Sequence, residues 1–367
     1  MKCIKYLMML SFWLYLQPAL ALTTVLPNSP AFLYTGRIDF TQAERPFISW
    51  PGSSIKANIS GDTLILIMDD DEGKNYFNVI VNGRDQHPAV ISLEKGEHQY
   101  DLSYLLSELQ PTATHQVEIF KRTEGHEGGT RFLGLKLSDN AKLQAAPKPL
   151  QRKIAYFGDS ITSGMGNEGA DNGDDKLSAE KNHYLSYAAM TARNLGAEFH
   201  SISLSGIGFM VSWFDYAMPT YFDQVSAVGD NNTLWDFNRW KPDVVVVNLG
   251  QNDFWITEDK NKLQQKPSDK DIVNAYKSFL MSLRGKYPKA NFISVIGSMD
   301  LARNDHVRWA GHLKMAVKEL NQNEAFINQP INFIQFDYNG YDAHPRVAQH
   351  WSNAEKLTKT IRELMGW

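Results

Sequence analysis

The chain has 367 residues, 43% of them hydrophobic and 21% charged, a composition typical of a globular protein long enough for two ordinary domains. The formal net charge is −4 and no basic stripe is present that could neutralise phosphates, which argues against a nucleic-acid partner. The aromatic content of 12% suits stacking on sugar rings, although an ordinary core explains it equally well.

Residues 1–21 have the features of an export signal. Lysines precede the apolar run Leu7–Leu16, and Ala19-Leu20-Ala21 offers small residues for cleavage after Ala21. The run is short for a membrane span, and no later segment of about 18 apolar residues occurs. We therefore expect a secreted or periplasmic protein without membrane contact after cleavage; a retained amphipathic anchor is the alternative. The only cysteine, Cys3, lies in this signal, so the mature chain can form no disulfide.

Residues 22–144 predict a β-sandwich. Hydrophobic residues alternate with polar ones, Gly, Asp, Asn and Pro punctuate the pattern, and Asn82-Gly83 is a hairpin turn signal. Many short strands at this spacing are typical of a sandwich, and a jelly roll is the expected topology. The expected strands are Gly36–Phe40, Phe47–Trp50, Ser54–Ile59, Thr63–Met68, Tyr76–Val81, Ala89–Ile91, His98–Asp101, His115–Lys121 and Arg131–Leu137.

An acidic run, Asp69-Asp70-Asp71-Glu72, interrupts this pattern. Carboxylates of this kind bind calcium in some loops, but the run lacks the ligand–glycine spacing of such a loop. We expect a solvated acidic turn.

After a proline-containing linker at 145–152, residues 153–367 predict an α/β domain. Strand patterns now alternate with helix patterns, which indicates a five-stranded parallel sheet between two helical layers, a three-layer α/β/α arrangement. The expected strands are Ile154–Phe157, Phe199–Leu204, Val244–Asn248, Phe292–Ile296 and Ile331–Phe336; the expected helices are Ser186–Leu195, Asp271–Leu283, Val307–Leu320 and Ala348–Met365.

Reactive residue types follow four of these strands. Ser160 follows the first, Gly206 the second, Asn252 the third and His344 the last. Because the carboxyl ends of parallel strands meet at one edge of the sheet, we expect these residues to lie together. Each one alone has a simpler explanation, such as a turn glycine, a helix cap or a surface histidine. Their joint occurrence favours catalysis.

The chemistry of this set is that of acyl transfer. A serine hydroxyl becomes a nucleophile when a base such as His344 takes its proton. The backbone N–H groups of Ser160 and Gly206 and the side-chain amide of Asn252 would stabilise the resulting oxyanion. No spacing of histidines or carboxylates supports a catalytic metal, and we expect no cofactor.

The order of these motifs resembles the SGNH (GDSL-type) hydrolase superfamily, in Gly158-Asp159-Ser160, Gly206, Gly250-x-Asn252-Asp253 and His344-Pro345. A narrower resemblance, to carbohydrate esterase family 2, covers almost the whole mature chain. It rests on Gly36-Arg37, Ser49-Trp50-Pro51-Gly52, Lys121-Arg122-Thr123-Glu124, Gly158–Thr162 and Asp342-Ala343-His344-Pro345. The resemblance implies a jelly roll joined to an SGNH domain, with Ser160 as nucleophile, His344 as base, and Ser160, Gly206 and Asn252 as the oxyanion hole.

One departure concerns the acid that orients the histidine. SGNH enzymes often place an aspartate three residues before the histidine, where this chain has Tyr341. Asp342, two residues before, is our candidate for the third catalytic residue, because alternation in an extended loop would put it on the side of His344. The alternative is a Ser–His dyad with a backbone carbonyl as the orienting group. Asp253 is expected to act as a structural cap.

Substrate contacts are expected from Trp213 and Trp255, which follow the oxyanion residues and could stack on a sugar. Packing in the core or in a lid is the alternative for each. The acidic insertion from Asn167 to Glu180 would line the cleft or form a mobile loop.

The resemblance thus implies a serine esterase that removes O-acetyl groups from plant polysaccharides such as xylan and glucomannan, or from their oligosaccharides. We expect a monomer. Two alternatives are an SGNH lipase or arylesterase acting on lipid or small esters, and a carbohydrate-binding protein with an inactive esterase site.

Overall fold

The computed structural model describes residues 22–84, 88–171, 173–228, 233–258, 262–303, 307–338 and 343–367. The predicted export signal, residues 1–21, lies outside the described residues. Among those described, no helix has both the length and the apolar composition that crossing a bilayer requires.

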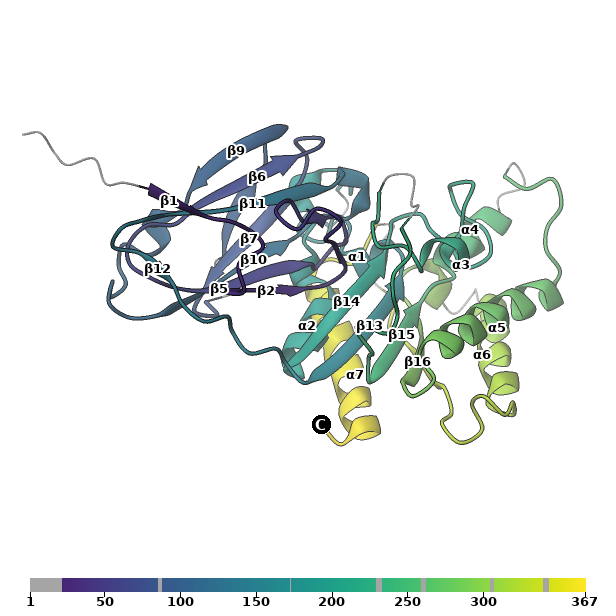
Figure 1. Cartoon of the computed structure of the whole chain (residues 1–367). Coiled ribbons are helices and arrows are strands. Elements are labelled where there is room, and N and C mark those ends of the chain that lie inside the picture. The colour runs from purple at the N-terminus through teal and green to yellow at the C-terminus, as the bar shows by residue number, and fades with distance from the viewer. Residues whose placement is uncertain are drawn as a thin grey trace, which may run out of the picture.

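The amino-terminal part is a β-sandwich (Figure 1), as predicted. Within the described residues it has two six-stranded antiparallel sheets, ordered β3-β4-β11-β6-β9 with β1 on β11, and β12-β5-β10-β7-β8 with β2 on β5. The side chains that face inward from both sheets form one apolar core. The strands are β1 Leu22–Val25, β2 Phe32–Thr35, β3 Ile38–Asp39, β4 Phe47–Ile48, β5 Ser54–Ser60, β6 Ile65–Asp70, β7 Tyr76–Val81, β8 Ala89–Ser92, β9 Gly96–Asp101, β10 His115–Lys121, β11 Thr130–Ser138 and β12 Lys142–Leu143, with short 3-10 helices at Ser103–Leu105 and Gly125–Glu127.

The acidic run is less solvated than expected. Asp70 is buried at the end of β6, where its carboxylate accepts hydrogen bonds from the N–H of Gly73 and from the side chains of Asn75 and Thr130. These bonds close a turn, so the prediction of a solvated turn is wrong for Asp70. No cluster of three metal-binding side chains is found in the described parts of the chain.

The carboxyl-terminal part contains the predicted five-stranded parallel sheet, in the order β14-β13-β15-β16-β17. Its first strand begins at Arg152, one residue inside the predicted linker. The strands are β13 Arg152–Gly158, β14 Ala197–Ser203, β15 Val244–Asn248, β16 Asn291–Ile296 and β17 Asn332–Gln335. The helices are α1 Ser160–Ser163, α2 Tyr187–Asn194, α3 Met218–Tyr221, α4 Gln251–Glu258, α5 Asp269–Lys286, α6 Val307–Leu320 and α7 Val347–Met365, with 3-10 turns at Ser178–Glu180, His183–Leu185 and Asp300–Ala302.

The central strand β15 shows why this sheet is buried on both faces. Val245 and Val247 belong to the core under α5 and α6, whereas Val244 and Val246 belong to the core under α2 and α7. A strand with apolar residues on both faces needs a helical layer on each side, which gives the three layers seen in Figure 1.

The sandwich and the α/β part share a polar and aromatic interface. The buried Arg37 donates to the carbonyl oxygens of Phe222 and Gln224, at 2.5 and 3.0 Å. The indole N–H of Trp50 donates to the carbonyl of Val225 at 2.7 Å. Arg37 and Trp50, which both carry the narrower family resemblance, therefore hold the two parts together.

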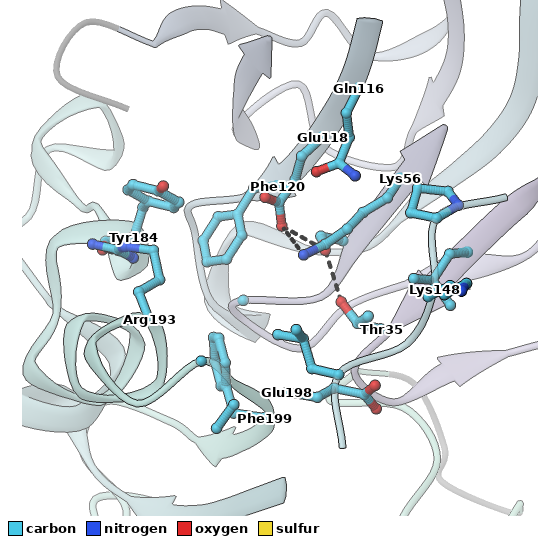
Figure 2. Close-up of a pocket in the computed structure, with 17 residues that line it drawn as sticks. Thr35, Lys56, Gln116, Glu118, Phe120, Lys148, Tyr184, Arg193, Glu198 and Phe199 are labelled. Atoms are coloured by element: carbon cyan, nitrogen blue, oxygen red, sulfur yellow. Dashed lines mark hydrogen bonds and ion pairs between the residues drawn. The ribbon is translucent and has the colours of Figure 1, made fainter. Parts of the chain in front are cut away.

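A cavity of about 290 Å³ lies at the same interface, between β5 and β10 on one side and α2 and β14 on the other (Figure 2). Lys56 and Glu118 form an ion pair in its wall. Its β14 residues, Ala197–Phe199, lie at the amino end of the parallel sheet, because Ala197 pairs with Arg152. The cavity is thus at the opposite end of the sheet from Ser160.

Candidate active site

Ser160 begins α1 directly after β13. Asp159 caps the helix by accepting the N–H of Ile161 at 3.0 Å, so the chain turns sharply where strand meets helix. Gly158 must be a glycine, because a Cβ there would come within 2.0 Å of Thr162 Oγ1. In the sheet, Gly158 pairs with Ser203 of β14 and Asn248 of β15, so the ends of the three strands lie side by side at Ser160.

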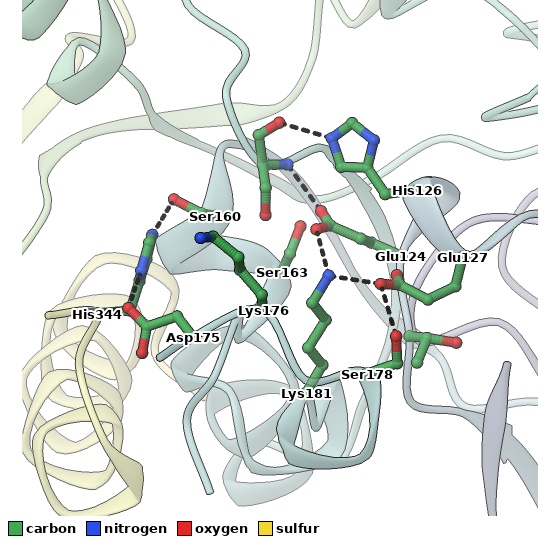
Figure 3. A network of polar contacts seen from close by, with 12 residues as sticks. Glu124, His126, Glu127, Ser160, Ser163, Asp175, Lys176, Ser178, Lys181 and His344 are labelled. Carbon is green, nitrogen blue, oxygen red and sulfur yellow. Dashed lines mark hydrogen bonds and ion pairs between the residues drawn. The ribbon is translucent and has the colours of Figure 1, made fainter. Parts of the chain in front are cut away.

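His344 reaches Ser160 from before α7, as predicted. Its Nε2 lies 2.8 Å from Ser160 Oγ, and its Nδ1 lies 2.6 Å from Oδ2 of Asp175 (Figure 3). A carboxylate only accepts, so Nδ1 carries the proton and Nε2 is free to accept the serine proton. Ser160, His344 and Asp175 form one continuous chain of hydrogen bonds.

Asp175 was not predicted for this position. It comes from the acidic insertion 167–180, and its Oδ2 also accepts the backbone N–H of His344 at 3.0 Å. Its other oxygen, Oδ1, bonds to the buried Arg346, which also donates to the carbonyl of Ala170 at 2.9 and 2.6 Å. The insertion therefore lines the site, which is one of the two alternatives predicted for it from the sequence. The predicted third residue, Asp342, lies outside the described residues.

The charge of Asp175 is secured by these partners. Burial alone would raise its pKa, but the hydrogen bonds from His344 and Arg346 outweigh burial and lower the pKa to about 2. The carboxylate therefore stays ionised at neutral pH, where it can hold the imidazole and stabilise a positive charge on it.

Gly206 is the third residue of a tight turn after β14. The turn is closed by a hydrogen bond from the N–H of Ile207 to the carbonyl of Leu204, and Gly206 has a φ of +88°. A positive φ at this position is the feature of a type II turn and strongly favours glycine. Among the described residues no acceptor is found for the N–H of Gly206 or for that of Ser160.

The side chain of Asn252 is buried in the first turn of α4, and its orientation is determined by two neighbours. Its Oδ1 accepts the indole N–H of Trp213 at 3.0 Å, and its Nδ2 donates to the carbonyl of Ile207 at 3.0 Å. Because an indole N–H can only donate, the amide cannot be flipped. One N–H of Nδ2 remains for a ligand.

Asp253 anchors the loop after Gly206 and is not a helix cap, which corrects the prediction. Its carboxylate accepts the backbone N–H groups of Phe209, Met210 and Val211 at 3.0, 2.8 and 2.9 Å. Burial raises the pKa of Asp253 to about 6, against the opposing effect of these hydrogen bonds. Its role is to hold the loop that carries Trp213.

The two predicted substrate contacts differ in their surroundings. Trp213 is 48% exposed and lies in the wall of a surface hollow of about 350 Å³, with the ammonium of Lys262 4.7 Å from its ring centre. Trp255 is half-buried against both cores of the α/β part and donates its indole N–H to Asp300 at 2.8 Å.

A serine, a histidine and an aspartate joined by hydrogen bonds at the carboxyl edge of a parallel α/β sheet are the arrangement typical of a serine hydrolase. The comparisons with known proteins agree. The family model described as carbohydrate esterase 2 N-terminal matches residues 34–147, and that of the GDSL-like lipase/acylhydrolase family matches residues 156–354.

Similar proteins include the cellulase/esterase CelE of Acetivibrio thermocellus, which is 34% identical over 93% of this chain; the chain spans 40% of that protein. An acetylxylan esterase/glucomannan deacetylase of Cellvibrio japonicus is 26% identical over 94% of this chain and 92% of its own length. A solved family two carbohydrate esterase from Clostridium thermocellum in complex with cellohexaose is 32% identical, with a TM-score of 0.80 over 92% of this chain and 99% of that one.

The chain belongs to carbohydrate esterase family 2. The resemblance predicted from the sequence motifs is thereby confirmed, and so is the two-part fold that it implied.

Proposed function

We propose that this protein is a secreted or periplasmic monomeric esterase that removes O-acetyl groups from plant cell-wall polysaccharides, such as xylan and glucomannan, or from their oligosaccharides. The observation that carries the chemistry is the hydrogen-bonded chain Ser160–His344–Asp175. The substrate class is supported by the acetylxylan esterase/glucomannan deacetylase from Cellvibrio japonicus and by the neighbour solved with cellohexaose.

In the proposed mechanism, Ser160 Oγ attacks the acetyl carbonyl while His344 Nε2 takes its proton. Asp175 stabilises the imidazolium through Nδ1–H. The N–H groups of Ser160 and Gly206 and the amide of Asn252 stabilise the oxyanion. The intermediate collapses to acetyl-Ser160 as the bond between the acetyl carbon and the sugar oxygen breaks, and His344 gives its proton to that oxygen, which leaves as the sugar hydroxyl. Water, activated by His344, then releases acetate and regenerates the serine.

The substrate class is tested by comparing acyl and alcohol parts separately. We expect faster acetate release from acetylated xylan, glucomannan or their oligosaccharides than from acetylated small alcohols, and a steep loss of rate when the acyl chain is lengthened. A preference for long acyl chains would contradict the proposal and favour a lipase. No hydrolysis of any ester would favour the binding protein.

Trp213 is the proposed sugar platform, with Trp255 as a second and less exposed candidate. Two substitutions of Trp213 separate stacking on the sugar from the hydrogen bond to Asn252. Trp213→Phe keeps a ring for stacking but loses the hydrogen bond to Asn252, so we expect mainly a lower kcat. Trp213→Ala loses both contacts, so KM for an acetylated oligosaccharide should also rise, about tenfold. KM for a small acetyl ester should not rise in either variant. Equal effects of the two variants on all parameters would argue against stacking at Trp213.

A further inference from the structure

A loop of the sandwich contacts the turn that carries Gly206. This loop follows β10, and two of its residues, Glu124 and His126 (Figure 3), bind the peptide groups on either side of Ser205. Oε2 of Glu124 accepts the N–H of Ser205 at 2.7 Å, and Nε2 of His126 lies 2.9 Å from the carbonyl oxygen of Ser205. Because a carbonyl only accepts, Nε2 of His126 carries a proton and donates it.

The carbonyl that His126 binds belongs to the same peptide unit as the N–H of Gly206. A peptide unit is planar and trans, so its N–H points opposite to its carbonyl. Holding the oxygen of Ser205 therefore sets the direction of the Gly206 N–H. A hydrogen bond to the oxygen also polarises the unit and makes its N–H a better donor.

This peptide unit is the one that can flip in a tight turn. Type I and type II turns differ mainly by rotation of the central peptide, by about 150 to 170° in the two adjoining dihedral angles. A flip would move the turn away from the φ of +88° seen at Gly206 and reverse its N–H. Glycine tolerates both states, so the residue that makes the turn possible does not itself select one.

We propose that Glu124 and His126 are positioning residues that lock the Ser205–Gly206 peptide in the state whose N–H faces the oxyanion. The inference rests on the proposed function, in which that N–H is a donor of the oxyanion hole. The sandwich thereby takes part in the reaction, because Glu124 and His126, which orient the N–H of Gly206, belong to it.

The surroundings of Glu124 hold its carboxylate in one position. Glu124 is buried, and its second oxygen lies 3.8 Å from Nζ of Lys181, which also bonds to the buried Glu127. Burial by itself would raise the pKa of Glu124, but Lys181, His126 and Ser205 outweigh burial and lower it. A charged acceptor bonds more strongly to a backbone N–H than a neutral one does.

The test uses His126, whose side chain is exposed. His126→Ala and His126→Gln both lose the ring contact with Phe214, 5.5 Å between ring centres, so the difference between them reports the hydrogen bond to Ser205. We expect His126→Ala to lower kcat for a small acetyl ester about tenfold and to leave KM within about twofold. The loss of kcat is smaller than the 10²- to 10³-fold that follows removal of an oxyanion donor, because the variant keeps the N–H of Gly206 and loses only the group that orients it. His126→Gln, whose amide can donate to the same carbonyl, should recover most of the rate. His98→Ala is the matched control, because His98 Nε2 also meets a backbone carbonyl, that of Lys95 at 3.0 Å, but on β9 in the sandwich.

An unchanged kcat in His126→Ala, or equal losses in His126→Ala and His126→Gln, would overturn the inference while the wild-type enzyme still hydrolyses the ester. The inference would also be overturned if His126→Ala and His98→Ala lost activity to the same extent and both had a lower melting temperature. Absence of hydrolysis in the wild type would instead be a failure of the proposed function.

Discussion

Ser160→Ala is expected to lower kcat/KM for an acetyl ester about 10⁴-fold or more, with the fold intact. The variant has no atom that can form the acyl intermediate, and the residual rate comes from binding and the oxyanion donors alone. The fold should tolerate the change because the hydroxyl bonds to His344 at the edge of the sheet and not within the core. The rate of acetate release at substrate concentrations well below KM tests the loss of activity, and circular dichroism tests the fold.

Ser163→Ala is the matched control for that substitution. Ser163 lies in the same short helix, and its hydroxyl bonds to Ser203 at 2.9 Å rather than to His344. We expect its activity to stay within about threefold of the wild type, because no group of the Ser160–His344–Asp175 chain is lost. A comparable loss in both variants would mean that disturbance of α1, and not loss of the nucleophile, explains the result.

Asp175→Asn is the second substitution with a large expected effect, a loss of about 10³- to 10⁴-fold in kcat. An amide of the same shape presents an N–H to His344 Nδ1, favours the wrong tautomer and cannot stabilise the imidazolium. The pKa of Asp175 is about 2, so its carboxylate is ionised above about pH 4. The loss should therefore persist across the neutral range and should not be restored by raising the pH.

Two other aspartates serve as comparisons for Asp175. Asp174 is exposed, and its carboxylate lies 3.9 Å from Nζ of Lys176 and accepts the N–H of Lys176 at 3.2 Å. An asparagine oxygen can accept the same N–H, so Asp174→Asn should leave kcat within about twofold. Asp342→Asn tests the acid predicted from the sequence, and we expect a change within about threefold. A large loss in Asp342→Asn with a small loss in Asp175→Asn would reverse the assignment.

Most of the candidate site follows from strand patterns. The amino-acid sequence alone predicts that Ser160, Gly206, Asn252 and His344 lie together, because each follows a strand of one parallel sheet and such ends share an edge. The five strands could be predicted for a related reason: runs such as Val244–Val247 are apolar on both faces.

Asp175 could not be found in this way, because it lies in an insertion without strand or helix periodicity, 169 positions before His344. The acidic character of residues 167–180 was the one available signal, and it does not say which carboxylate meets the histidine. The partner is selected by the path of the insertion, which Arg346 holds through Asp175 and the carbonyl of Ala170.

The contacts between the sandwich and the α/β part could not be predicted from sequence patterns either. Arg37, Trp50 and Glu124 were recognised as motif residues, but their contacts cross 81 to 185 positions of sequence and depend on how the sandwich packs on the sheet. Trp213 shows the same limit on a smaller scale, since its spacing after Gly206 does not reveal that its indole N–H holds Asn252.

The role of Ser160 as the nucleophile is tested most directly by labelling the wild-type enzyme with a small alkyl fluorophosphonate. Peptide mass spectrometry then shows how many labels each chain carries and on which residue. The reagent forms a stable bond to an activated serine and mimics the oxyanion intermediate. We expect one phosphonyl group per chain, on Ser160, with loss of acetate release in proportion and slower labelling in the presence of an acetylated oligosaccharide. Complete inactivation with the label on another residue, or full labelling of Ser160 with undiminished acetate release, would contradict the account.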